Sequence, residues 1–101
     1  MMILRFERRT FGAGDRLAFW LASRKNLAVL EAADGPSELT YIVYAATQED
    51  AMQQYYDREG WGTYKAIPGI ADRAFSSEML DAQLADFPED TELRRLNGMA
   101  S

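Results

Sequence analysis

Residues 38–62, ELTYIVYAATQEDAMQQYYDREGWG, contain a strong strand signal followed directly by a complete helix signal. Segment 38–45 is rich in Thr, Tyr, Ile and Val and is apolar or aromatic on both faces, which predicts a central strand covered on two sides. Thr47 is placed to cap a helix over 48–59, whose first turn carries acids where the helix dipole favours them. Gly60 ends that helix. A buried strand leading into an amphipathic helix predicts a mixed α and β fold.

The end of this helix is unusually aromatic. If Gly60 is the left-handed residue after the helix, Trp61 is placed to fold back on Tyr55 and Tyr56, as in the Schellman motif. Tyr, Trp and Arg are also the residues that dominate protein–protein hot spots. The same stretch therefore supports two readings that can share residues: a structural helix stop, and an interaction patch formed by Tyr55, Arg58, Trp61 and Tyr64.

The N-terminal third gives weaker signals. Residues 2–9 alternate between apolar and charged side chains, which predicts a strand with one buried face at an edge of the sheet. Asp15 is placed to cap a short helix through Ser23, although LAFWLAS (17–23) is equally compatible with a strand in a longer hairpin. Segment 27–32 predicts a strand that pairs with 38–45 through a turn over 33–37.

The C-terminal half predicts mainly helix. A short strand is expected over 63–67, closed by a turn at Pro68-Gly69. Ser76 or Ser77 is placed to cap a further helix, and a last short helix is expected over about 91–97. The fold predicted from all segments is α+β: a small, mostly antiparallel sheet of three to four strands, covered by helix 48–59 and the C-terminal helices. Residues 1–101 are expected to form a single compact domain.

Composition argues against most enzyme chemistry. The chain has no cysteine and no histidine, so thiolate nucleophiles, Cys- or His-based metal sites and His proton transfer are excluded. The sequence GAGDRL (12–17) has Leu17 where a dinucleotide fingerprint needs its third glycine. Glu89, Asp90 and Glu92 lack the spacing of a calcium loop, and Asp57 and Glu59 are expected to face different ways on their helix. No catalytic residue, cofactor or metal is therefore predicted.

Charge is distributed unevenly along the chain. Residues 1–30 hold six basic and two acidic groups, a net charge of +4, whereas residues 31–101 hold five basic and fourteen acidic groups, a net of −9. Such asymmetry is compatible with a bipolar surface that meets two different partners, but the two halves are expected to touch and partly neutralise each other. A net charge of −5 argues against direct nucleic-acid binding. No run approaches the ~18 apolar residues needed to span a bilayer, and a cytoplasmic location is expected.

These observations favour a non-enzymatic protein-interaction or regulatory module, with a protein partner or a second copy of the chain as its ligand. The strand–cap–helix run is typical of many small bacterial domains and assigns no function. The alternative is an acidic mobile-element inhibitor that occupies a nucleic-acid-binding surface of a partner, because residues 72–92 contain seven acids and one Arg. An enzyme or small-ligand binder that uses Tyr and carboxylates is the third class.

Overall fold

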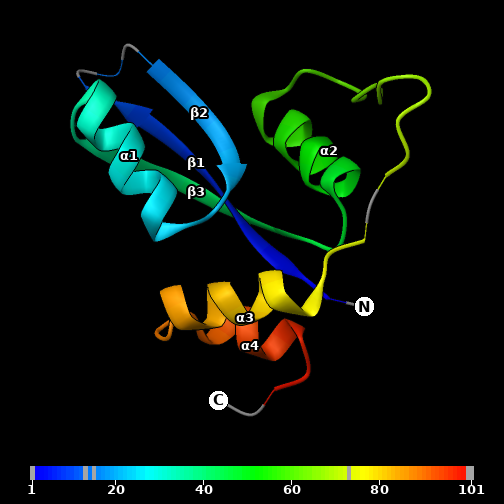
Figure 1. The fold of residues 1–101 in the computed structure, drawn as a ribbon. Helices are drawn as coiled ribbons and strands as arrows, with labels where there is room; N and C mark the ends of the chain where they lie inside the picture. The colour runs from blue at the N-terminus through cyan, green and yellow to red at the C-terminus, as the bar shows by residue number, and fades with distance from the viewer. Residues whose placement is uncertain (1, 13, 15, 73, 100–101) are drawn as a thin grey trace.

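The computed structural model describes residues 2–12, 14, 16–72 and 74–99 and has the α+β architecture expected from the sequence (Figure 1). Its antiparallel sheet has the strand order β2-β1-β3. The strands are β1 (Leu4–Phe11), β2 (Arg16–Leu21) and β3 (Ser37–Ala45). The helices are α1 (Arg24–Asp34), α2 (Gln48–Glu59), α3 (Ser77–Asp86) and α4 (Thr91–Leu96).

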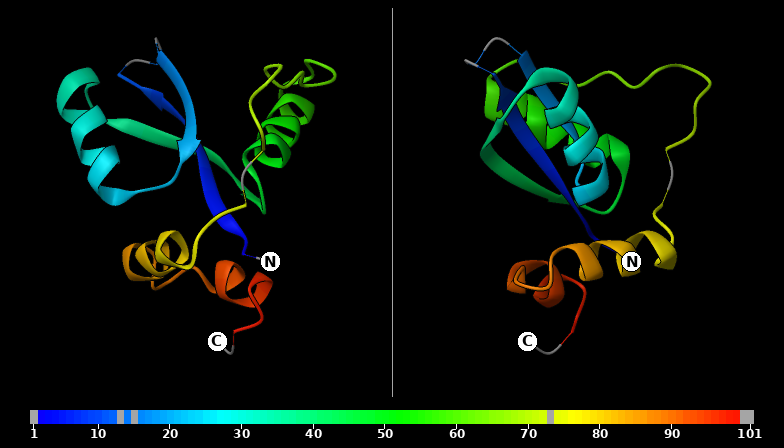
Figure 2. Two further views of the ribbon diagram at one scale, coloured as in Figure 1. Left: turned by 45° about the vertical axis from the view of Figure 1, so that its right-hand side comes forward. Right: turned by 60° about the vertical axis from the view of Figure 1, so that its left-hand side comes forward.

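The helices surround the sheet on three sides. The views in Figures 1 and 2 place α1 and α2 on opposite sides of the sheet and α3 with α4 across the end where β1 begins. The main core lies between the sheet, α2 and these C-terminal helices. Its buried members are Leu4, Phe6, Val43, Ala45, Ala51, Leu80 and Leu93. The predicted cover of the sheet by helix 48–59 and the C-terminal helices is therefore confirmed.

The predicted helix over 15–23 is wrong, and the strand alternative is right. β1 and β2 form a hairpin in which Phe6 lies opposite Leu21 and Arg8 opposite Phe19. Residues on both faces of β2 are partly covered, so its sequence lacks the apolar–polar alternation that marks a half-buried strand. Asp15, the expected helix cap, lies outside the described residues.

Segment 27–32 is helical, so the predicted strand and its hairpin with 38–45 are also wrong. Ser23 caps α1 by accepting a hydrogen bond from the backbone N–H of Asn26, and Gly35 follows the helix with a φ of 92°. A short apolar run fits a strand or a helix equally well in sequence. Here the run belongs to an alanine-rich segment that Ser23 caps, and these local signals favour a helix over a strand.

The central strand is β1 rather than segment 38–45, and β3 lies at an edge. The sequence of β1 suggested one solvent-facing side, but Arg5 and Glu7 are only 8% and 1% exposed. Charged side chains can be buried when they neutralise one another, and on β1 Glu7 pairs with both Arg5 and Arg9. Residues 63–67, predicted as a short strand, form no strand because no neighbouring strand pairs with them in the described part of the chain.

Candidate protein-interaction surface

The end of α2 has the predicted Schellman geometry. Gly60 is left-handed, with φ 74° and ψ 28°. The Trp61 N–H donates to the Tyr56 carbonyl at 3.0 Å, and the Gly60 N–H donates to the Asp57 carbonyl at 3.4 Å. These are the two bonds that define the motif. The helix therefore stops at Glu59, and the following chain turns back along α2.

Replacing Gly60 with alanine is expected to lower the free energy of unfolding by about 1 kcal/mol, because a side chain in the left-handed region is strained. A Cβ at this position would meet no atom within 4 Å, so the cost is conformational rather than steric. Chemical denaturation would measure it. Gly60→Asn is the control and should cost less, since Asn tolerates this conformation. A neutral Gly60→Ala variant would contradict the expectation.

Four aromatic side chains pack together at this turn and are called here the aromatic cluster: Tyr55, Tyr56, Trp61 and Tyr64. The Trp61 ring lies edge-on to Tyr55 and Tyr56, with centroid distances of 5.2 and 5.4 Å. The Tyr64 ring meets Tyr56 at 5.2 Å. Trp61 remains 54% exposed, whereas Tyr55 is 9% exposed and stacks on Phe19 of β2 at 4.2 Å. Of the predicted patch, Tyr55 is thus part of the core, and Trp61 with Tyr64 reaches the surface.

Arg58, the remaining predicted patch residue, lies on another side of α2. Its guanidinium carbon is 4.7 Å from the centre of the Tyr41 ring, a cation–π contact. The Tyr41 hydroxyl donates to Glu59 at 3.0 Å, and Arg8 pairs with the same carboxylate at 3.1 Å. Arg58 is therefore exposed but positioned by Tyr41, and among the described residues no cation–π contact joins it to Trp61 or Tyr64.

The Tyr41 hydroxyl provides a pH-dependent contact. Burial is the main cause that raises the pKa of Tyr41 from 10.0 to about 12, and the hydrogen bond to Glu59 is the second. Its protonated form is thus favoured by folding. The resulting stability is fully present below pH 10 and is lost as pH rises toward 12, because the unfolded chain releases this proton first.

We expect the free energy of unfolding to fall across this pH window and to fall less steeply in the Tyr41→Phe variant. Denaturant titrations at several pH values from 8 to about 12 would measure both slopes. Some slope should persist in the variant, because burial and a hydrogen bond to Asp90 also raise the pKa of Tyr44. Parallel curves for the two proteins would contradict the assignment to Tyr41.

The connection between α2 and α3, residues 60–76, forms a groove that sequence reasoning missed. The cavity has a volume of about 650 Å³ and lies beside Tyr64. Its lining residues come from the start of α2, the connection and the start of α3: Gln48, Glu49, Tyr64, Ala66, Ile67, Ile70, Ala71, Asp72, Ala74, Phe75, Ser76 and Met79. Ile67 and Ile70 are 63% and 65% exposed. The available sequence signal was a pair of isoleucines on either side of the Pro68-Gly69 turn.

Short contacts hold the connection against α2. The Gln53 side chain accepts from the Tyr64 N–H at 2.9 Å and donates to the Gly62 carbonyl at 3.2 Å. Farther along, the Asp72 carboxylate accepts from the Glu49 N–H at 3.2 Å. Thr47 and Ala74 form an isolated β-bridge. The groove is therefore fixed by hydrogen bonds, and its mostly apolar lining includes two acids, Glu49 and Asp72.

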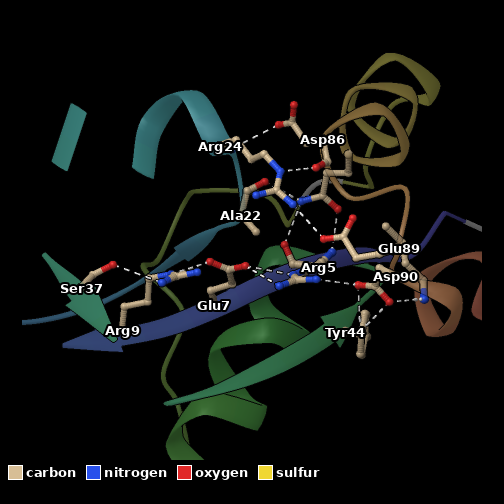
Figure 3. A network of polar contacts seen from close by, with 12 residues as sticks. Arg5, Glu7, Arg9, Ala22, Arg24, Ser37, Tyr44, Asp86, Glu89 and Asp90 are labelled. Carbon is tan, nitrogen blue, oxygen red and sulfur yellow. Dashed lines mark hydrogen bonds and ion pairs between the residues drawn. The ribbon is translucent and has the colours of Figure 1, made fainter. Parts of the chain in front are cut away.

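A group of charged side chains lies on the face of the sheet away from the aromatic cluster. Figure 3 shows these charges alternating in a row along β1. Arg5 pairs with Glu7 at 2.7 Å and with Asp90 at 2.9 Å, and Arg9 pairs with Glu7 at 2.8 Å. Asp90 also accepts from the Tyr44 hydroxyl at 3.0 Å. Because each buried charge has an opposite partner, the row is best explained as a structural network.

The acids considered in the sequence are separated by the fold. Asp57 accepts from Gln53, whereas Glu59 accepts from Arg8 and Tyr41, so the expectation that they face different ways is confirmed. Across the described ranges, no three His, Cys, Asp or Glu side chains are grouped in a way that could hold a metal ion. The expected neutralisation between the two halves is also confirmed by the pairs Arg5–Asp90, Arg8–Glu59 and Arg24–Glu89.

Comparisons with known proteins give no match: no family model, no curated protein and no solved structure is significantly similar to this chain. In the part of the chain that the structure describes, each helix is too short or too polar to cross a bilayer. The functional argument therefore depends on the surface itself.

Proposed function

We propose that this chain is a non-enzymatic protein-interaction module that binds its partner through the exposed side of the aromatic cluster and the adjoining groove. The observation that carries the proposal is the α2–α3 connection. Connections longer than about 12–15 residues without secondary structure are uncommon in compact domains and are usually either functional or flexible linkers. Residues 60–76 exceed that length, and unlike a flexible linker they are fixed by two hydrogen bonds to α2: the Tyr64 N–H donates to the Gln53 side chain, and the Glu49 N–H donates to Asp72.

The residue types on this surface support the same proposal. Trp61, Ile67 and Ile70 are large apolar residues that are more than half exposed. Apolar side chains gathered beside a groove are typical of protein-binding sites, and Trp and Tyr are enriched among the residues that dominate binding energy. The three lie on one continuous segment of chain beside Tyr64, which contributes to both the cluster and the groove.

The test compares Trp61→Ala with Val29→Ala in affinity capture from the host cell, followed by mass spectrometry. Val29 is 63% exposed on α1, so the control removes a similar exposed apolar side chain elsewhere. We expect Val29→Ala to capture the same protein as the wild type. Trp61→Ala should weaken its binding about 30-fold, the loss of a hot spot worth about 2 kcal/mol.

Circular dichroism of Trp61→Ala decides whether the loss is specific. A folded variant that no longer binds supports the proposal, whereas a folded variant that binds as the wild type refutes it. If Trp61→Ala unfolds, Ile70→Asp replaces it, because Ile70 is more exposed and lies outside the core. Equal capture by folded Ile70→Asp would likewise count against this surface.

The acidic-inhibitor alternative has less support. Of the seven acids in 72–92, Glu89, Asp90 and Glu92 form ion pairs with arginines of this chain. Exposed Asp72, Glu78 and Asp81 would have to provide much of the acidic surface. Such a complex should dissociate as salt is raised from about 0.1 to 1 M, because interfacial charge is screened over this range. A complex that survives high salt and depends on Trp61 favours the aromatic surface instead.

A further inference from the structure

The outer edge of β2 carries an unused set of backbone hydrogen-bonding groups. β2 pairs with β1 on one side only, because the strand order is β2-β1-β3. The register identifies the outward groups. The Ala22 N–H donates to the Arg5 carbonyl at 2.9 Å, so Ala22 and Arg5 form a hydrogen-bonded pair. Pairs of this kind alternate along an antiparallel ladder, and the next ones are Trp20 with Glu7 and Ala18 with Arg9.

The intervening residues, Leu17, Phe19 and Leu21, therefore direct their N–H and C=O groups away from β1. In the described part of the chain, no other backbone or side-chain group hydrogen-bonds to them. Elsewhere on the margins of the sheet, side chains bond some of the outward backbone groups. At the outer edge of β3, Gln54 donates to the Tyr44 carbonyl at 2.8 Å, and beyond the end of β2, Gln83 bonds both the N–H and the C=O of Arg5.

β2 also lacks the usual protection of an edge strand. Its sequence is RLAFWL, with no proline, no lysine and no bulge in its pairing with β1. Natural edge strands generally use such features to prevent pairing with another chain. Leu17 is 43% exposed on the same side of the sheet as Phe19. The edge is thus apolar as well as unpaired.

The arrangement is self-complementary. The outward residues are spaced evenly on either side of Phe19, so a two-fold axis at Phe19 places Leu17 of each copy opposite Leu21 of the other. In this register Arg16 lies opposite Ala22 and Ala18 opposite Trp20, so no two like charges face each other. We propose that two copies of this chain associate by antiparallel pairing of their β2 strands, which joins the two sheets into one six-stranded sheet.

The chain exposes more surface than a compact monomer of its mass. Its accessible surface is 6360 Å², whereas a compact monomer of 11.4 kDa is expected to expose about 5,800 Å². Its radius of gyration is 14.2 Å against an expected value of about 13 Å. On the α2 side of the sheet, Phe19 stacks on Tyr55, which contacts half-exposed Trp61. Phe19, at the centre of the proposed pairing, is thus covered on its α2 side by Tyr55 of its own chain.

Amide hydrogen exchange read by NMR at several protein concentrations tests the pairing directly. In the dimer, the amides of Leu17, Phe19 and Leu21 become hydrogen-bonded, and we expect their exchange to slow at least about ten-fold as concentration rises. The amides of Ala18 and Trp20 point to β1 and should be protected at every concentration. Sedimentation measured on the same samples should show the monomer converting to a dimer.

Leu17→Lys and Leu39→Lys form a matched pair of variants, because both side chains are partly exposed, 43% and 36%, on outer strands of the sheet. We expect Leu17→Lys to be a folded monomer and Leu39→Lys to dimerise as the wild type does. A chain that stays monomeric up to about 1 mM, the weak end of specific association, overturns the proposal. So does a dimer in which the three outward amides exchange at their unprotected rates. Partner capture through Trp61 can fail or succeed independently of these results.

Discussion

Replacing Glu7 with alanine is expected to lower the free energy of unfolding by about 3–5 kcal/mol, the usual result of removing one member of a buried ion pair. Glu7 is 1% exposed, and its two carboxylate oxygens pair with Arg5 and Arg9. Without it, the buried guanidinium of Arg5 and the partly buried one of Arg9 face each other without the intervening negative charge. Chemical denaturation followed by circular dichroism would measure the change.

Glu92→Ala is the matched control for this prediction. Glu92 also pairs with an arginine, Arg95, but both side chains are largely exposed, so the loss should be within about 0.5 kcal/mol. A second comparison uses the double variant Arg5→Met with Glu7→Leu, which removes charge from both sides of the pair. It should be no more stable than Glu7→Ala, because Asp90 then loses Arg5 while Arg9 still lacks Glu7. A loss below about 1 kcal/mol for Glu7→Ala would show that the row of charges is not required.

Phe6→Ala is expected to cost about 3–5 kcal/mol, through lost burial and the cavity that remains. Phe6 is fully buried on the central strand and is the point where three elements meet. Its ring lies 5.7 Å from Phe19 of β2 and 5.9 Å from Phe75, which precedes α3. The loss should appear as a lower denaturation midpoint with little change in slope.

A graded series makes this result interpretable. Phe6→Leu leaves a smaller cavity and should lose less than half as much stability as Phe6→Ala. Val29→Ala, at an exposed position on α1, should change the free energy of unfolding by no more than about 0.5 kcal/mol. If Phe6→Ala were no more destabilising than Val29→Ala, the core would not be centred on Phe6.

The segments that were predicted correctly are those whose ends are marked by local chemistry. Helix α2 begins and ends where Thr47 and Gly60 indicated, and Trp61 folds back on the tyrosines as the helix-stop pattern predicted. Ser76 likewise caps α3. Such signals can be recognised in sequence because the cap and its partner lie within a few residues of each other.

The candidate site was predicted only in part. The sequence identified Trp61 and Tyr64 and placed Tyr55 against Trp61, but it could not show that Tyr55 stacks on Phe19, a residue 36 positions earlier in the chain. The groove was missed for the same reason. Its walls come from the start of α2, the connection and α3, and no local pattern joins these segments.

What the sequence by itself determined is the α+β class, the helices α2, α3 and α4, the end of α2, and the exclusion of histidine and cysteine chemistry. Tertiary structure decided the secondary structure of residues 16–21 and 24–34, the central position of β1 in the sheet and the burial of its charged side chains. These features depend on pairing between distant residues, such as Arg5 with Asp90, which lie 85 positions apart. A charged side chain is compatible with solvent or with a buried partner, and only the folded chain selects between them.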